Sequence, residues 1–470
     1  MYADRVVGVP VCVVDMTHGG MDLCAALSRR GAFPAAVDVH HTLENADLRI
    51  LHKGGIPVFA SFAEAVSAHS PEVVMMQYAP DREAITAYCG ETGLPLMTHA
   101  KATGLILGER LASVATTEIT GARGKSTVMG MLSSIMSHTG EPSLFMTSMG
   151  AYVQHGSERT IICGQGSITP SHALHVVDAA DAADAAGCAF SSCFLEISLG
   201  GTGLGDVCSV LGIPLELRAG IGRSAFFSKA QMAELMRPGA VLNVNASDPP
   251  SRSLRLLTGT RCNVVGNAPE ASLFTTRNAW YSGDGELTLN LAAFSTLCND
   301  SLTSAFSLAP PPRLFGTMAV DTMLAAAGVA LALGVPTASI RAGISAYEPL
   351  PRRMVFSREG GVHRITNTAT SKETTLLALD EAARYARIRG LPLHAVVGGR
   401  TKTTCGAMDL FGLAAGINTR LPRFDSFLVY GELGRDLSGA GCAASFVPSV
   451  EGGAPLMHTQ DDSVVIACIN

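Results

Sequence analysis

Short apolar runs alternate with amphipathic stretches along the first part of the chain, which is typical of a parallel β-sheet whose strands are joined by helices. The first expected strand ends at Asp15 and leads through Met16–Gly20 into a helix expected at Met21–Arg30. The expected strands are Val11–Asp15, Ala35–Val39, Ile56–Ala60, Val73–Gln77 and Leu94–Met97. We therefore predict a Rossmann-like domain over residues 1–112. Its first turn lacks the Gly-x-Gly-x-x-Gly fingerprint, so His18-Gly19-Gly20 is either a binding loop or a plain tight turn.

A second block, residues 113–308, begins with an expected strand at Val114–Thr120. A helix at Ser171–Ala186 and a strand at Phe190–Ile197 follow, and the turn-rich stretch 281–286 precedes a strand at Leu287–Leu291. Three aspartates in the expected helix recur at every third residue and indicate a solvated face: Asp178, Asp181 and Asp184. Ala309-Pro310-Pro311-Pro312 is the clearest linker signal in the chain.

The third block, residues 309–470, alternates again between helices and strands. Expected helices are Thr322–Leu333 and Thr374–Ile388, and expected strands are His363–Thr366 and His394–Val397. The stretch from Thr322 to Ile340 carries no charge, but its small residues and glycines favour a buried helix ending near Gly334 over a membrane span. The fold class predicted is α/β, with three domains.

Composition narrows the class of protein further. A length of 470 residues favours about three domains, and 47% hydrophobic against 16% charged residues makes disorder improbable on composition alone. The net charge of −6 argues against a nucleic-acid surface. The 12 cysteines form no Cys-x-x-Cys pair and are expected to be small buried apolar residues of a cytoplasmic protein. The N-terminus lacks the apolar core of a signal peptide.

The segment Thr120-Gly121-Ala122-Arg123-Gly124-Lys125-Ser126-Thr127 carries the strongest chemical signal. It lies between an expected strand and an expected helix, and its two glycines let backbone N–H groups face phosphate oxygens at the positive end of that helix. Lys125 would neutralise the β- and γ-phosphates of ATP, and the hydroxyl of Ser126 would bind Mg²⁺. The alternative is an ordinary strand-to-helix turn with a surface lysine.

A Mg²⁺ ion held against phosphates usually needs a carboxylate from a neighbouring strand end. Glu196 closes the apolar run Ala189–Leu195 and meets this requirement. Because the carboxyl ends of parallel strands face one crevice, we expect Glu196 to lie near Ser126.

These motifs resemble those of the Mur ligases. The phosphate loop is similar to the Thr-Gly-Thr-Asn-Gly-Lys-Thr loop of that family, and Leu195-Glu196-Ile197-Ser198 is similar to its Mg²⁺-binding Glu segment. Ile168-Thr169-Pro170 resembles its Thr-Thr-Pro loop, Arg352-Arg353-Met354 its Gly-Arg-Met joint, and Val397-Gly398-Gly399-Arg400 its Gly-Gly-Arg segment. The resemblance implies an ATP-dependent ligase with N-terminal substrate, central ATPase and C-terminal Rossmann-like domains. It implies catalytic roles for Lys125, Glu196 and Arg400, nucleotide contacts from residues 120–127, Arg353 and Asn367, and Mg²⁺ ligation by Ser126, Glu196 and Thr169.

The departures from the family pattern fall on the half of the enzyme that handles an amino-acid acceptor. Arg218–Ser224 replaces the Asn-Ile-x-x-Asp-His stretch, and Leu314–Ala319 replaces Gly-x-His-Asn. Lys229 is either the counterpart of the family's carbamylated lysine or an unrelated neighbour. With Val13–Gly20, this pattern resembles Mur-like synthetases of methanogens that complete a nickel-tetrapyrrole coenzyme.

That resemblance implies activation of a propionate side chain as an acyl phosphate, followed by attack from a ring carbon to close a carbocycle. The implied partner is a small molecule, a nickel-tetrapyrrole precursor, with no nucleic acid or membrane and a monomeric or homodimeric enzyme. Candidates for its binding wall are Arg218, Arg223, His172 and His175 in the second block and His18, His40 and His41 in the first. Two alternatives remain: an amide ligase that adds an amino acid, and a nucleotide-binding regulator or kinase.

Overall fold

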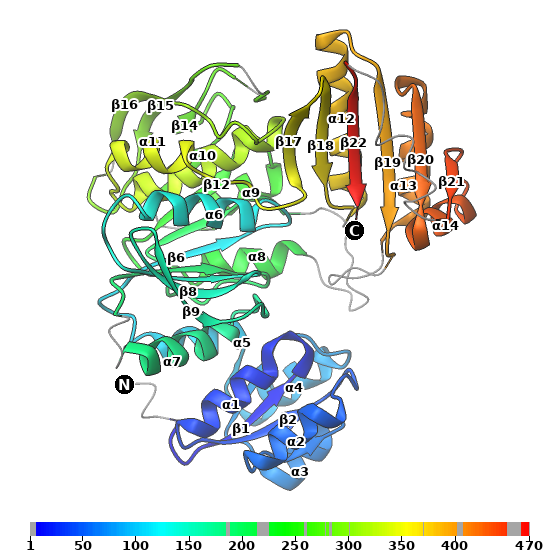
Figure 1. The fold of residues 1–470 in the computed structure, drawn as a ribbon. Coiled ribbons are helices and arrows are strands. Elements are labelled where there is room, and N and C mark those ends of the chain that lie inside the picture. The colour runs from blue at the N-terminus through cyan, green and yellow to red at the C-terminus, as the bar shows by residue number, and fades with distance from the viewer. Residues whose placement is uncertain are drawn as a thin grey trace. The chain divides into compact units, whose positions relative to one another are not determined.

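The computed structural model describes residues 6–184, 189–213, 225–257, 261–277, 279–281, 284–299, 301–369, 371–401, 408–448 and 462–469. By its internal contacts the chain divides into two units. The first comprises Met1–Phe274, Leu291–Ser304 and Ala325–Ile340, and the second comprises Thr275–Asn290, Ala305–Leu324 and Arg341–Asn470. The predicted α/β class is confirmed, because helices accompany three separate sheets (Figure 1). The domain limits at 112 and 308 stay predictions, and the Ala309–Pro312 segment lies inside the second unit.

The first sheet has five strands in the order β3-β2-β1-β4-β5, and its pairs are parallel. The strands are β1 (Pro10–Val14), β2 (Phe33–Val37), β3 (Val58–Phe59), β4 (Val73–Met76) and β5 (Leu96–Met97); the helices are α1 (Met21–Arg29), α2 (Asn45–Lys53), α3 (Phe62–His69), α4 (Arg82–Thr92) and α5 (His99–Leu107). All five predicted strands are found. The two edge strands, β3 and β5, are shorter than predicted, since an edge strand has a ladder partner on one side only.

The second sheet has eleven strands in the order β16-β15-β14-β13-β12-β11-β6-β10-β7-β8-β9. Its strands are β6 (Ala115–Thr120), β7 (Ser143–Thr147), β8 (Gly150–His155), β9 (Glu158–Cys163), β10 (Ser192–Glu196), β11 (Val207–Val210), β12 (Val241–Asn245), β13 (Arg261–Val265), β14 (Leu273–Phe274), β15 (Leu287–Phe294) and β16 (Leu302–Leu308). The middle strands are parallel, whereas β7, β8 and β9 pair antiparallel. Strand β6 lies between β10 and β11, so the phosphate loop that follows it leaves the centre of the sheet.

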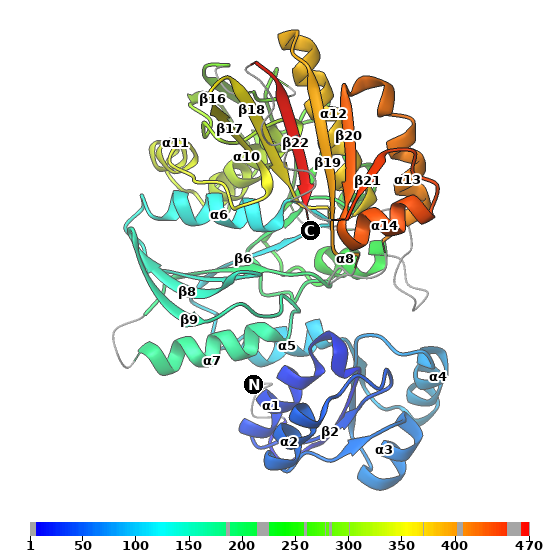
Figure 2. The same cartoon turned by 45° about the vertical axis from the view of Figure 1, so that its right-hand side comes forward.

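Helices α6 (Lys125–Met136) and α7 (His172–Asp184) belong to this part of the first unit, with α8 (Ala225–Glu234) and α9 (Pro249–Ser253). Helix α7 lies along β8 and β9, as both ribbon views show (Figure 2). Its predicted last residues, 185 and 186, lie outside the described residues. The aspartates of α7 are not simply solvated: Asp178 pairs with Arg29 and Arg30, and Asp181 pairs with Arg110. Periodicity alone does not reveal these arginine partners, which lie far away in sequence.

Helix α10 (Thr317–Ala332) contains most of the uncharged stretch, and α11 (Thr337–Ser345) follows it. Gly334 has a φ of 82°, which ends the helix close to the predicted position. Among the described residues, no helix is long and apolar enough to cross a membrane.

The third sheet has the order β17-β18-β22-β19-β20-β21. Its strands are β17 (Arg353–Glu359), β18 (Val362–Asn367), β19 (Leu393–Gly399), β20 (Ser426–Tyr430), β21 (Ser445–Val447) and β22 (Val464–Ile469); its helices are α12 (Lys372–Arg389), α13 (Leu410–Asn418) and α14 (Gly431–Gly439). Only β17 pairs antiparallel among the described pairs of this sheet. An apolar core that includes Phe315, Tyr385 and Ile466 fills this part of the molecule.

Candidate functional site

The phosphate loop connects the end of β6 to the start of α6. Gly124 precedes Lys125 as the N-cap of α6 and has φ 82° and ψ −16°, a left-handed conformation that favours glycine. The amide of Ala122 donates to the carbonyl of Gly212 (3.0 Å), which fixes the loop against the end of β11. Ala122 and Arg123 are exposed. The loop therefore presents backbone N–H groups at a helix N-terminus, an arrangement suited to phosphate oxygens.

Ser126 and Glu196 come together as predicted from the strand order. The hydroxyl of Ser126 donates to Glu196 Oε1 (2.8 Å). The amide of Ser148, in the turn between β7 and β8, donates to Glu196 Oε2 (3.0 Å). The Ser126 and Ser148 hydroxyls are also 3.0 Å apart. The ends of β6, β7 and β10 thus meet in one cluster of hydroxyl and carboxylate oxygens.

Glu196 is completely buried. Among the described residues, no Lys, Arg or His forms an ion pair with it, and only hydroxyl and amide groups donate to it. A buried carboxylate without a cation is costly, and Mg²⁺ prefers oxygen ligands. Ser126 and Glu196 therefore fit a divalent cation, whose chemistry would be to neutralise phosphate charge during transfer.

Two lysines lie at the end of β6. Lys125 donates to the carbonyl of Gly121 (2.8 Å) at the start of the loop. Lys229, on α8, is buried and donates to Thr120 Oγ1 (3.2 Å) and to the carbonyl of Ser198 (3.1 Å). Lys229 is thus placed between the phosphate loop and the strand that carries Glu196.

Thr169 is buried, and its hydroxyl accepts a hydrogen bond from Ser167 (3.0 Å). The preceding residue, Ile168, accepts from the amide of Ser198 (2.8 Å), so this loop lies beside the segment after Glu196. On its other side is Gly19: a Cβ added there would stand 2.8 Å from Thr169 Oγ1. The His18-Gly19-Gly20 loop therefore packs against the Thr169 loop. The Mg²⁺ role of Thr169 stays a prediction.

Arg353, Asn367 and Arg400 lie at one edge of the third sheet. Asn367 ends β18 and is in register with Arg353 at the start of β17. Arg400 follows β19, and both β18 and β19 are parallel neighbours of β22. The carboxyl ends of β18 and β19 and the amino end of the antiparallel β17 thus form the edge that holds the three residues that the resemblance assigns to nucleotide binding or catalysis. Their role stays a prediction.

The other wall candidates are placed unevenly. Arg218 and Arg223 lie outside the described residues. His172 pairs with Asp22 (3.1 Å between Nδ1 and Oδ2), and its ring is tilted against that of His175. His18 and His40 lie close together at the carboxyl edge of the first sheet.

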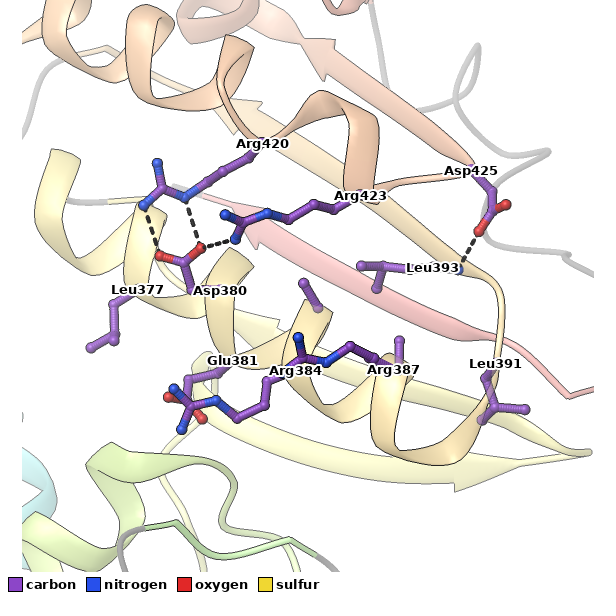
Figure 3. Close-up of a pocket in the computed structure, with 12 residues that line it drawn as sticks. Leu377, Asp380, Glu381, Arg384, Arg387, Leu391, Leu393, Arg420, Arg423 and Asp425 are labelled. Atoms are coloured by element: carbon purple, nitrogen blue, oxygen red, sulfur yellow. Dashed lines mark hydrogen bonds and ion pairs between the residues drawn. The ribbon is translucent and has the colours of Figure 1, made fainter.

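A cavity of about 780 Å³ lies in the second unit (Figure 3). It is near Leu393 and Asp425, which stand at the amino ends of β19 and β20, so it opens at the sheet edge opposite Arg400. Asp380 in its wall pairs with Arg420 and Arg423. These ion pairs neutralise the charge of Asp380. Ligands of α/β sheets bind at the carboxyl edge, so this cavity lies at the edge away from the expected binding site.

The sequence does not predict three polar residues at these strand ends as hydrogen-bonding partners: Asp15, Tyr78 and Ser148. Ser148 lies in an antiparallel turn, and Asp15 was assigned to the end of a strand without a role. Tyr78 carries a signal that was available, since it directly follows the predicted strand Val73–Gln77. Its hydroxyl is hydrogen-bonded to Ser228, next to Lys229.

No protein-family model matches the chain. It is 26% identical over 402 residues to the coenzyme F(430) synthetase of Methanosarcina acetivorans, covering 81% of this chain and 80% of that one. Among solved structures it resembles MurF from Acinetobacter baumannii, with 15% identity, a TM-score of 0.58 and coverage of 98% and 90% of the two chains. It also resembles a bifunctional folylpolyglutamate synthase/dihydrofolate synthase from Yersinia pestis, with 17% identity, a TM-score of 0.55 and coverage of 79% and 90%. These findings confirm the predicted resemblance to the Mur ligases at the level of the fold.

Proposed function

We propose that the chain uses ATP to activate a propionate carboxylate of a nickel seco-tetrapyrrole and closes a carbocyclic ring by carbon–carbon bond formation. The supporting observation is the pair formed by Ser126 and the buried Glu196 beside a glycine-containing phosphate loop. The likeness to a coenzyme F(430) synthetase over four fifths of the chain supports the choice of substrate.

In the first step, a carboxylate oxygen of the substrate attacks the γ-phosphorus of ATP, giving an acyl phosphate and ADP. The loop amides and the Lys125 ammonium would hold the phosphates, with Ser126 and Glu196 binding the divalent cation. The solved relative from Yersinia pestis was crystallised with AMPPNP and a manganese ion, which supports a nucleotide and a divalent metal here. We propose that Mg²⁺ fills this role and that Arg400 adds positive charge near the transferred phosphoryl group.

In the second step, a ring carbon attacks the acyl carbon. The new carbon–carbon bond forms, the bond to phosphate breaks, and the proton of the attacking carbon is released to solvent. The products are ADP, phosphate and a macrocycle that has lost one water relative to the seco-acid.

A second candidate is an amide ligase that transfers the acyl group to an amino acid. The specific observation in its favour is the structural likeness to MurF and to a folylpolyglutamate synthase. For either reaction, we propose that the protein acts in the cytoplasm. Its proposed partner is a small molecule rather than a nucleic acid.

The test incubates the full-length protein with MgATP and the nickel seco-acid, and in parallel with an amino-acid panel and the seco-acid. We expect ADP and phosphate in equal amounts, and by mass spectrometry a product lacking one water, without any amino acid. Release of AMP would overturn acyl-phosphate chemistry. A product heavier by an amino-acid residue would establish the amide ligase instead.

A further inference from the structure

The carboxyl edge of the first sheet holds a cluster of polar side chains separate from the phosphate loop. Strand β1 is flanked by β2 on one side and β4 on the other, so the direction of the strand order reverses there. Asp15 follows β1 and His18 lies in the next turn, while His40 lies after β2. Such a reversal leaves a crevice between the loops, which is where open α/β sheets bind ligands.

Asp15, His18 and His40 each place one potential metal-ligand atom within 4.8 Å of the others. Asp15 is fully buried, and the side chains of His18 and His40 are 25% and 17% exposed. The first pair is close, with 2.7 Å between His18 Nδ1 and Asp15 Oδ2, and the rings of the two histidines meet edge to face. The cluster is therefore enclosed but not sealed from solvent.

The ring of His40 has a buried nitrogen that lacks a hydrogen-bond partner in the described part of the chain. This atom, Nε2, stands 3.8 Å from Asp15 Oδ1. That separation is too long for a hydrogen bond. Two ligands of one tetrahedral ion, each about 2.1 Å from it, stand about 3.4 Å apart. A shift of a few tenths of an ångström would let both atoms bind the same cation.

A hydrogen-bonded cluster without a metal ion explains only part of this geometry. Asp15 accepts from the amides of His18 (3.2 Å) and Tyr78 (3.0 Å), and it is also bonded to the His18 ring. Those bonds account for His18, but they leave the buried nitrogen of His40 facing a carboxylate that it does not reach. A cation shared by the two groups accounts for both.

We propose that Asp15, His18 and His40 form a binding site for a divalent transition-metal ion such as Zn²⁺, Co²⁺ or Ni²⁺. Two imidazoles and one carboxylate suit these ions, whereas Mg²⁺ and Ca²⁺ take oxygen ligands. Three protein ligands leave at least one coordination position open for water or another small ligand. The site is distinct from the Mg²⁺ site at Ser126 and does not depend on the proposed function.

The test is calorimetric titration of metal-stripped, untagged full-length protein with Zn²⁺. Excess Mg²⁺ is present and nucleotide is absent, so that the oxygen site at Glu196 does not contribute. We expect one saturable Zn²⁺ per chain, and we expect His40→Asn and His18→Asn each to weaken binding by at least about 10-fold. Co²⁺ should give a visible absorption band in the wild type that His40→Asn loses.

His52→Asn is the matched control, because His52 is an exposed histidine on α2 of the same sheet domain. This variant should bind Zn²⁺ like the wild type, as should Glu196→Gln. His40→Asn removes no hydrogen bond of the described structure, so its thermal unfolding in chelator should match that of the wild type. The proposal is overturned if no saturable binding is seen, if His40→Asn binds as tightly as the wild type, or if Glu196→Gln or His52→Asn loses the site.

Discussion

At the scale of single residues, a lysine and a fully buried glutamate lie beside the phosphate loop. Lys125 stands at the start of α6, and Glu196 is enclosed at the end of β10. Both side chains thus lie at the strand edge from which the phosphate loop leaves the sheet. A divalent cation bound with ATP would supply positive charge next to Glu196, and the phosphates would lie within reach of Lys125.

Replacing Lys125 by Ala should lower kcat at least about 100-fold, because one phosphate contact is lost in the transition state. The measurement is ADP release at saturating MgATP. Lys101→Ala, an exposed lysine on α5, should leave the rate unchanged. Normal ADP release from Lys125→Ala would refute the assignment of the loop.

Glu118 on β6 predicts a pH dependence of stability. It is completely buried, and burial raises its pKa above the ordinary value of 4.5, outweighing hydrogen bonds from Thr202 and the charge of Arg237. The native state then holds this proton more tightly than the unfolded chain does. Its contribution to stability is full below pH 4.5 and is lost as the pH rises through the raised native pKa.

Glu118→Gln cannot ionise, so its stability relative to the wild type should rise with pH across that window. Thermal unfolding measured at several pH values between 4 and 8 checks this, with the exposed Glu72→Gln as control. An equal difference between Glu118→Gln and wild type at every pH would contradict the raised pKa.

Sequence and structure agree at the residue scale where strand order decides the contact. Ser126 and Glu196 are predicted neighbours because both follow central parallel strands, and they are hydrogen-bonded. Ser148 and His40 are not predictable as partners in this way. Each lies in a turn, and the exact course of a turn depends on side-chain packing that no hydrophobic pattern encodes.

At the scale of elements, the turn from β6 into α6 depends on one backbone conformation. Gly124 is left-handed, and a residue with a Cβ pays about 1 kcal/mol or more there. Gly124→Ala should therefore lower stability by about that amount and also weaken ATP binding, as the loop amides turn away from the phosphates.

Gly140 offers a matched control in the turn that follows α6, four residues beyond its end. It has φ 77° with open space around its Cα, so Gly140→Ala brings the same backbone cost without touching the loop. Equilibrium ATP binding should fall for Gly124→Ala only. Equal affinities for the two variants would show that the loop conformation does not matter for the nucleotide.

The elements most readily predicted are the central buried strands, since β1 and β4 are apolar runs bounded by polar turns. The pair β8 and β9 was not predicted. Strand β9 is mostly exposed, and its residues Glu158, Arg159 and Thr160 give little apolar signal. Strand β9 pairs with β8, and β8 pairs with β7, in antiparallel ladders. These strands therefore depend on tertiary contacts rather than on a local sequence pattern.

At the scale of the whole molecule, the second unit is assembled from separate parts of the sequence. Residues 275–290 and 305–324 join residues 341–470. Glu381, nearly buried on α12, accepts from the Tyr281 hydroxyl (3.2 Å), the Thr317 amide (3.3 Å) and the Thr317 hydroxyl (3.1 Å). The three-block pattern of the sequence could not reveal this arrangement, because none of these contacts is local.

Tyr281→Phe should lower the free energy of unfolding by about 1.5–3 kcal/mol, since it removes a hydrogen bond to a buried carboxylate. Denaturant unfolding checks this, with Tyr88→Phe as control because that ring packs on Phe62 in the first sheet domain. A loss of stability no larger than that of Tyr88→Phe would show that Glu381 does not depend on this donor.

The tie between Tyr281 and Glu381 also sets an order in time during synthesis. The donor Tyr281 is synthesised 100 residues before its acceptor Glu381. At about 5–20 residues per second, Tyr281 and its neighbour Phe315 wait for several seconds before α12 can cover them. A newly made chain therefore carries exposed aromatic surface through that interval, and slowed translation after residue 324 should increase its demand for chaperones.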